Sequence, residues 1–215
     1  MPIHRGIFVT GTDTNVGKTW VGQRLIRALI KRGIDVVPRK PVESGWTNNI
    51  EETDAWKLAS AANITNKIDQ VCSYRFKHAV SPVRAARLEN QCVNLNDIKQ
   101  QCLSNIQDNQ FLHIEGAGGF YSPLAENALN ADLAEALALP VLLVAEDRIG
   151  CINQILLTVE VAQARGLNIT AIFLNNTTEN SNKAMDNQED IRELINVPVM
   201  TNIDNLADSI MEQLQ

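Results

Sequence analysis

The chain alternates short apolar runs with longer stretches in which apolar residues recur every three or four positions. Such alternation is typical of parallel βαβ units, in which a helix crosses over the sheet after each strand. The apolar runs predict strands at residues 7–10, 36–39, 111–115, 141–145, 169–175 and 197–200. We therefore expect an α/β fold with a mostly parallel central sheet and helices on both of its faces.

The clearest helix pattern lies between the first two predicted strands. Val21, Leu25 and Leu29 recur at helical spacing, and Gly33 stands where a left-handed residue commonly ends a helix. Three further helices are predicted to begin at Thr53-Asp54, at Ser81-Pro82 and after Asn96. Residues 177–187 are polar and without periodicity, which predicts a mobile surface loop.

The length and the charge limit the class of protein. With 215 residues, 45% of them apolar, the chain can bury one sizeable core, and it contains neither an internal repeat nor a linker. A single domain over residues 1–215 is therefore expected. The formal net charge of -6 and the pI of about 5.1 argue against nucleic acid as a partner and favour small charged substrates.

The N-terminal region and the cysteines indicate the compartment. The apolar run at residues 7–9 is short and is followed by polar residues and glycine, so the sequence predicts neither a signal peptide nor a membrane span. The four cysteines form no C-x-x-C pair and are expected to be buried free thiols, with two disulfides as the alternative. The three histidines are far apart, which argues against structural zinc. We expect a cytoplasmic protein that does not bind a membrane.

A phosphate-binding loop is predicted at residues 11–19, GTDTNVGKT, between the first strand and the first helix. Backbone N–H groups and the positive end of the helix favour phosphate oxygens at such a place. Lys18 can reach the terminal phosphates, and the Thr19 hydroxyl is placed to bind Mg²⁺. Five residues separate the two glycines, whereas the usual pattern has four. The loop predicts an enzyme that uses ATP and Mg²⁺, and a chance helix start is the alternative.

Three further polar segments follow predicted strands: residues 40–45 (KPVESG), 115–119 (EGAGG) and 150–153 (GCIN). In an open parallel sheet, ligands gather outside the carboxyl ends of the strands. Glu115 is the hardest of these residues to explain as structure, because a carboxylate that ends an apolar run is costly to bury without a partner. The sequence therefore predicts one site assembled around the phosphate loop from several strand ends.

These segments resemble the dethiobiotin synthetase family. The similarity runs from about residue 6 to residue 175 and rests on six ordered motifs: G-T-D-T-x-V-G-K-T, K-P-V-x-S-G, T-D-A, E-G-A-G-G, G-C-I-N and a strand that ends in asparagine. The resemblance implies an ATP-dependent carboxylation and ring closure of 7,8-diaminopelargonate with CO₂ or bicarbonate, giving dethiobiotin, ADP and phosphate. The implied intermediates are a carbamate and its mixed anhydride with phosphate.

The resemblance also implies which residues form the site. Lys40 and Lys18 are the implied catalytic lysines, and Thr19, Asp54 and Glu115 are the implied residues around Mg²⁺. The implied contacts with ATP are Asn15, Val16, Gly17, Lys18, Thr19, Trp20, Asp54, Glu115, Gly116, Ala117, Gly118, Asn175 and Asn176. The implied contacts with the diamine are Thr14, Ser44, Gly118, Gly150, Cys151 and Asn153. In the family the last three come from the partner subunit, which implies a homodimer with the substrate site at the subunit interface.

Ordinary structural roles stay open for several of these residues. Lys40 is also compatible with a solvated lysine after a strand, and Asp54 with a helix cap. The glycines of residues 116–119 also suit a tight turn. Asn153 can cap a helix, and Asn175 can form a turn at the end of its strand.

The chain departs from the family pattern at three places. Asn15 stands where many members carry glutamate, and Asn176 replaces a common acidic residue. Residues 197–206 lack the usual glycine followed by an Ile-Pro segment. These departures predict an altered rate or affinity and leave base selectivity open.

Three other functions stay open at this point. A partitioning-type regulatory ATPase shares the fold, but Asp13 and Thr14 stand where such proteins usually carry a signature lysine. An amidoligase of cobalamin synthesis needs a glutaminase domain that 215 residues cannot hold. The third is a nucleotide-binding paralogue with weak or no turnover, which Asn15 suggests.

Overall fold

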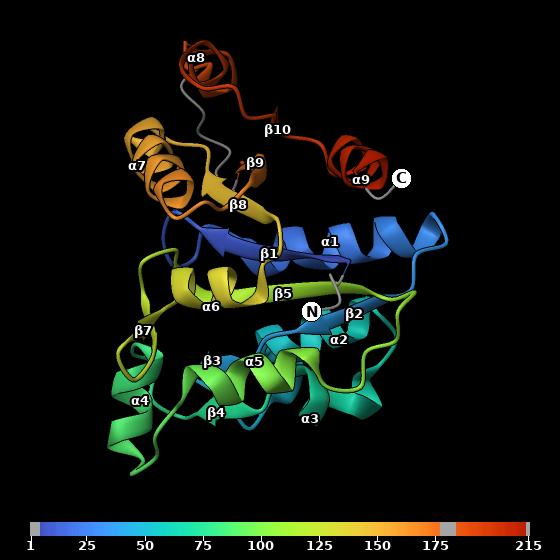
Figure 1. Cartoon of the computed structure of the whole chain (residues 1–215), viewed down its shortest axis with the longest axis vertical. Helices are drawn as coiled ribbons and strands as arrows, with labels where there is room; N and C mark the ends of the chain where they lie inside the picture. Colours follow the sequence, from blue (N-terminus) through green and yellow to red (C-terminus); the bar gives the residue numbers. More distant parts are fainter. Residues whose placement is uncertain (1–4, 177–183, 214–215) are drawn as a thin grey trace.

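The predicted strands form one sheet in the computed structural model, which describes residues 5–176 and 184–213. The strand order is β10-β9-β8-β1-β5-β2 (Figure 1). The strands are β1 (Gly6–Gly11), β2 (Val36–Arg39), β5 (Phe111–Gly119), β8 (Val141–Glu146), β9 (Ile169–Asn175) and β10 (Val199–Met200). Each neighbouring pair in this sheet is parallel, which confirms the predicted α/β fold.

Side chains alternate between the two faces of the sheet, and each face has its own apolar core. On one face, Ile7 and Val9 of β1 pack with residues of α1 (Lys18–Lys31) and α9 (Ile203–Glu212). On the other face, Phe8 belongs to a core that includes residues of α5 (Leu95–Leu103), α6 (Asn130–Leu137) and α7 (Cys151–Ala164). Helices therefore cover both faces, as the alternating pattern predicts (Figure 1).

The other helices are shorter than α1 except for α7, which has the same length. They are α2 (Asp54–Ala61), α3 (Ile68–Val71), α4 (Pro82–Leu88), α5 (Leu95–Leu103), α6 (Asn130–Leu137), α7 (Cys151–Ala164) and α8 (Asn187–Leu194), with single 3-10 turns at Ile50–Glu52 and Thr65–Lys67. Two small sheets were not predicted: β3 (Val42–Ser44) pairs in parallel with β4 (Tyr74–Phe76), and β6 (Pro123–Ala125) pairs antiparallel with β7 (Ala128–Leu129).

The helix ends test the predicted start and stop signals. Gly33 has a φ of 83° and follows α1, so the left-handed end of this helix is confirmed. The Thr53 hydroxyl accepts a hydrogen bond from the Trp56 N–H and caps α2. The predicted start after Asn96 is wrong by two residues, because α5 begins at Leu95.

Other boundaries also differ from the sequence-based expectation: β1 and β8 are slightly longer than predicted, and β10 begins at Val199 instead of residue 197. The strand predicted to end at Glu115 continues to Gly119, and Gly119 pairs with Gly11 of β1. Most of the predicted loop at residues 177–187 lies outside the described residues, and α8 begins at Asn187.

All four cysteines, which lie in the described part of the chain, are free thiols. Cys72, Cys102 and Cys151 are buried as predicted, whereas Cys92 is exposed. Within residues 5–176 and 184–213, no helix is both long enough and apolar enough to cross a membrane.

Candidate active site

The phosphate loop joins β1 to α1 through two residues with positive φ, Asn15 at 60° and Gly17 at 92°. Asparagine and glycine tolerate this left-handed conformation best, so the local sequence suits the turn. A Cβ atom at Gly17 would lie 2.0 Å from Nδ2 of Asn175, because the end of β9 packs directly against the loop. The Asn175 Nδ2 donates a hydrogen bond to the Val16 carbonyl at 3.0 Å, and both residues are buried.

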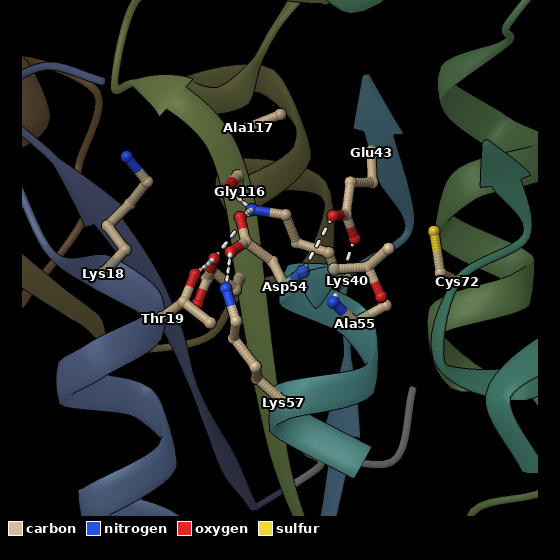
Figure 2. A network of polar contacts seen from close by, with 12 residues as sticks. Lys18, Thr19, Lys40, Glu43, Asp54, Ala55, Lys57, Cys72, Gly116 and Ala117 are labelled. Carbon is tan, nitrogen blue, oxygen red and sulfur yellow. Dashed lines mark hydrogen bonds and ion pairs between the residues drawn. The ribbon is translucent and has the colours of Figure 1, made fainter. Parts of the chain in front are cut away.

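A cluster of charges with a buried centre lies beside the loop, where β1 and β2 end next to the middle of β5. Lys40 Nζ is 2.7 Å from Glu115 Oε1 and 3.5 Å from Asp54 Oδ2. The Thr19 hydroxyl, at the start of α1, donates to the same Glu115 oxygen at 2.8 Å. Figure 2 shows Thr19, Lys40 and Asp54 converging from three different elements. The four residues meet because parallel strands present their carboxyl ends at one edge of the sheet.

Glu115 has an exposed fraction of 0%, and its second oxygen, Oε2, has no hydrogen-bond partner among the described protein atoms. A buried carboxylate oxygen without a partner is costly, and a cation resolves that cost. Asp54, with 39% of its side chain exposed, stands on the solvent side of the cluster. Two carboxylates and a hydroxyl are hard oxygen ligands, and Mg²⁺ commonly takes only one or two carboxylates beside phosphate oxygens and water.

The two lysines have opposite electrostatic surroundings. Burial alone lowers the pKa of Lys40, but the Glu115 and Asp54 carboxylates outweigh it and raise the pKa above its ordinary value. Burial and the nearby Lys40 ammonium lower the pKa of Lys18 to about 8. The Lys18 Nζ donates only to the Asp13 carbonyl, at 3.0 Å, among the hydrogen bonds of the described residues. The surroundings of Lys40 therefore favour its charged form, whereas Lys18 gains most from a bound anion.

A cavity of about 510 Å³ opens onto this cluster and the phosphate loop. Eight of the predicted site residues line it: Thr14, Asn15, Lys18, Lys40, Ser44, Asp54, Ala117 and Gly118. The sequence-based prediction missed the remaining lining residues, which are Glu43, Ala79, Val80, Ser81, Pro82, Ser122 and Pro123.

The glycine segment is held by a residue that the sequence did not single out. The Asn130 amide accepts from the Ala117 N–H and donates to the carbonyls of Ala117, Gly119 and Ser122. A Cβ atom at Gly116 would lie 2.6 Å from the Asn130 Oδ1. Close backbone approach therefore explains the glycines better than a plain tight turn, because these residues are part of β5.

Other predicted site residues lie outside the cavity. Trp20 is 42% exposed, and the Arg24 guanidinium stacks over its ring at 3.5 Å. Asn176 is exposed just after β9. The lining of the cavity includes neither Gly150, which precedes α7 with a φ of 89°, nor the following Cys151 and Asn153. Within one chain the G-C-I-N segment thus does not line the cavity.

Comparison with known proteins gives the same answer for the fold. Residues 5–213 match the family model described as an AAA domain. Among solved structures, the chain is similar to the septum site-determining protein MinD from Pyrococcus horikoshii (TM-score 0.55, 18% identity, 97% of this chain and 86% of that chain). It is also similar to the MinC:MinD cell division complex of Aquifex aeolicus (TM-score 0.58, 13% identity, 97% and 85%). At these identities the similarity shows the P-loop fold alone.

The sequence relatives are closer. The chain is 41% identical over 179 residues to the ATP-dependent dethiobiotin synthetase BioD of Ruthia magnifica, covering 82% of each protein. It is 35% identical over 214 residues to the enzyme of the same name from Vesicomyosocius okutanii, covering 98% of this chain and 95% of the relative. A Bacillus thuringiensis relative of that name is 33% identical over 91% of the chain. The chain belongs to the ATP-dependent dethiobiotin synthetase family.

Proposed function

We propose that the protein is an ATP-dependent dethiobiotin synthetase, a ligase that carboxylates 7,8-diaminopelargonate with CO₂ and closes the ring to give dethiobiotin, ADP and phosphate. The observation that carries this proposal is the cluster of buried Lys40 and Glu115 with the partly exposed Asp54 and Thr19 beside the phosphate loop. It stands beside a cavity large enough for a small diamine and the terminal phosphates together. The family relatives support the same reaction.

The reaction brings a carbamate and the terminal phosphate of ATP together, and two positively charged lysines can stabilise these anionic groups. One amine of the diamine adds CO₂ to form a carbamate, and a carbamate oxygen attacks the terminal phosphorus of ATP with release of ADP. The second amine then attacks the carbamate carbon, forms the new C–N bond and expels phosphate. Lys18 and Lys40 line the cavity in which these oxygens meet, so their ammonium groups offset the negative charge that develops in each step.

We propose Thr19, Asp54 and Glu115 as the residues that hold Mg²⁺. Their oxygens are the donor type that Mg²⁺ prefers, and the unpartnered Oε2 of Glu115 supports a cation at this place. When bound, Mg²⁺ would offset the charge of the terminal phosphates. In the ranges 5–176 and 184–213 no three His, Cys, Asp or Glu side chains cluster as a metal site, which suits a metal that shares its ligands with a nucleotide.

The remaining contacts divide between the two substrates. For the diamine we propose Thr14, Ser44 and Gly118, all of which line the cavity. For ATP we propose the phosphate-loop residues, the glycine segment and the end of β9. These nucleotide contacts are Asn15, Val16, Gly17, Lys18, Thr19, Trp20, Asp54, Glu115, Gly116, Ala117, Gly118, Asn175 and Asn176.

We further propose a homodimer in which Gly150, Cys151 and Asn153 of one subunit complete the substrate site of the other. The positive end of α7 suits the distant carboxylate of the substrate, although the Cys151 N–H itself donates to the Arg148 carbonyl at 3.1 Å. Large apolar side chains beside this segment are exposed, with Ile149 at 76% and Leu157 at 56%. Leu157→Asp is expected to shift the protein from dimer to monomer in analytical ultracentrifugation, and a monomeric starting protein would contradict the proposal.

A single domain is the simplest organisation of these parts, because both apolar cores pack on one sheet. We propose the cytoplasm as its compartment, in agreement with the absence of a membrane-spanning helix in the described part of the chain.

The deciding experiment supplies purified protein with MgATP, bicarbonate and 7,8-diaminopelargonate and measures dethiobiotin by mass spectrometry. The expected result is a product whose formation requires both ATP and bicarbonate. Folded protein that binds nucleotide but yields no dethiobiotin would refute the proposed reaction.

A further inference from the structure

Glu43 is a buried carboxylate in the wall of the cavity, and none of the catalytic steps described above uses it. It lies on β3, three residues after Lys40, and is 8% exposed. Its Oε1 accepts a hydrogen bond from the backbone N–H of Asp54 at 2.7 Å, and its Oε2 accepts one from the N–H of Ala55 at 2.9 Å. Figure 2 shows Glu43 reaching the first turn of α2 from the neighbouring strand.

These two hydrogen bonds are not needed as the N-cap of α2, because the helix has another cap. The Thr53 hydroxyl already accepts from the Trp56 N–H, so α2 has an ordinary N-cap of its own. Glu43 instead takes the N–H groups of the residue that carries the Asp54 carboxylate and of the residue after it. A carboxylate that receives two backbone N–H groups is a strong and directional anchor.

The anchor ties Asp54 to the chain segment that carries Lys40. The backbone N–H of Lys40 donates to the Val71 carbonyl at 2.8 Å, and β3 continues that segment by pairing with β4. Lys40 and Glu43 therefore belong to one segment that is held in place by backbone hydrogen bonds. From this segment, Lys40 Nζ lies 3.5 Å from Asp54 Oδ2. On its other side Asp54 faces Lys57 Nζ at 4.0 Å, a half-exposed cation that competes for the same carboxylate.

We infer that Glu43 is a positioning residue: by holding the first two N–H groups of α2, it fixes the Asp54 carboxylate at the metal site beside Lys40 and Glu115. The inference rests on the proposed function, in which Asp54 holds Mg²⁺. It predicts that loss of Glu43 weakens metal binding through Asp54 and leaves metal-free nucleotide binding intact.

The test measures binding of Mn²⁺, which takes the same oxygen ligands as Mg²⁺, to full-length protein saturated with ADP, by electron paramagnetic resonance of the free ion. Glu43→Ala is expected to weaken Mn²⁺ binding roughly tenfold, the size of one charge-assisted hydrogen bond. The Mn²⁺ affinity of Glu43→Gln is expected to lie between those of wild type and Glu43→Ala. The glutamine oxygen can accept one backbone N–H, but its NH₂ group faces the other donor. ADP affinity measured in EDTA is expected to stay within about twofold of wild type.

Two comparisons separate positioning from general support of the helix. Thr53→Ala removes the other cap of α2 without touching Asp54 and is expected to leave Mn²⁺ affinity unchanged. The double variant Glu43→Ala/Asp54→Ala is expected to bind Mn²⁺ no more weakly than Asp54→Ala alone, because both changes act through one carboxylate. Should Glu43→Ala fail to fold, Glu43→Gln provides the same comparison.

Any of four results would overturn the inference. The first is an unchanged Mn²⁺ affinity in the Glu43 variants, and the second is an equally large change in Thr53→Ala. Either result would mean that Glu43 has a structural role only, and neither would contradict the role of Asp54. Additive losses in the double variant would show that Glu43 acts independently of Asp54. If Asp54→Ala itself binds Mn²⁺ with wild-type affinity, Asp54 does not hold the metal. The proposed positioning role of Glu43 is then wrong as well.

Discussion

Replacing Lys40 with methionine is expected to destabilise the protein as well as to abolish turnover. The Lys40 ammonium lies 2.7 Å from Glu115, a carboxylate with an exposed fraction of 0%, and also donates to the Gly116 carbonyl at 3.0 Å. Removing one partner of a buried ion pair costs about 3–5 kcal/mol, because the remaining charge is buried without compensation. For a chain of 215 residues this corresponds to a fall in Tm of about 6–20 °C.

The measurement is the free energy of unfolding from urea denaturation followed by circular dichroism, without nucleotide. Lys40→Met/Glu115→Gln removes both charges and is expected to recover most of the lost stability while staying inactive. Lys57→Met is the matched control, because its ammonium lies 4.0 Å from Asp54 but the side chain is 38% exposed. Its expected cost is below about 1 kcal/mol. A Lys40→Met protein with the wild-type urea midpoint would refute the argument that the buried Glu115 side chain needs the Lys40 ammonium as a partner.

Three further predictions concern the phosphate loop and the glycine segment. Burial and a neighbouring ammonium lower the pKa of Lys18 to about 8, whereas phosphate oxygens favour its charged form. The free protein therefore loses this proton as the pH rises above about 8. The ADP affinity measured by calorimetry is therefore expected to fall as the pH rises above about 8, and Lys18→Met is expected to remove this pH dependence. Gly17→Ala is expected to weaken ADP binding strongly, since its Cβ would lie 2.0 Å from the Asn175 amide. Gly33→Ala, at a similar φ with open space around it, is expected to leave ADP binding unchanged. Asn130→Ala leaves the partly buried backbone of Ala117 and the buried carbonyl of Gly119 unpaired, and is expected to cost about 1–3 kcal/mol in urea denaturation. Wild-type stability in that variant would show that water replaces the amide.

The sheet could be predicted from the sequence because its strands are continuous apolar runs that end in turns. The bounds at residues 36–39 and 169–175 are correct for this reason. The end of β5 could not be predicted, because the charged Glu115 interrupts the apolar run. The glycines that follow have no side chains and therefore show no alternation of apolar and polar residues. The β3 and β4 strands have only three residues each, too few to show an alternation.

The site was predictable where its residues follow strands of the main sheet. Lys40 and Glu115 meet because β2 and β5 are neighbours, a consequence of parallel topology. Glu43 and Asn130 act through backbone groups that are distant in sequence, and no motif marks such partners. The one available signal for Glu43 was its place in residues 40–45, between two residues already assigned to the site.

If Asn175 contacts the base, as proposed, its hydrogen bond to Val16 would link the two ends of a bound nucleotide. One hydrogen of the Asn175 amide is engaged with the phosphate loop, and the other hydrogen and the oxygen are the groups with which it would meet a base. A base that rotates this amide would also disturb its bond to the Val16 carbonyl, and with it the loop proposed to cradle the phosphates. Base recognition and phosphate affinity would then be thermodynamically coupled through a single side chain, and the coupling would be reciprocal. Nucleotides that differ only in their bases would differ in how firmly their phosphates are held.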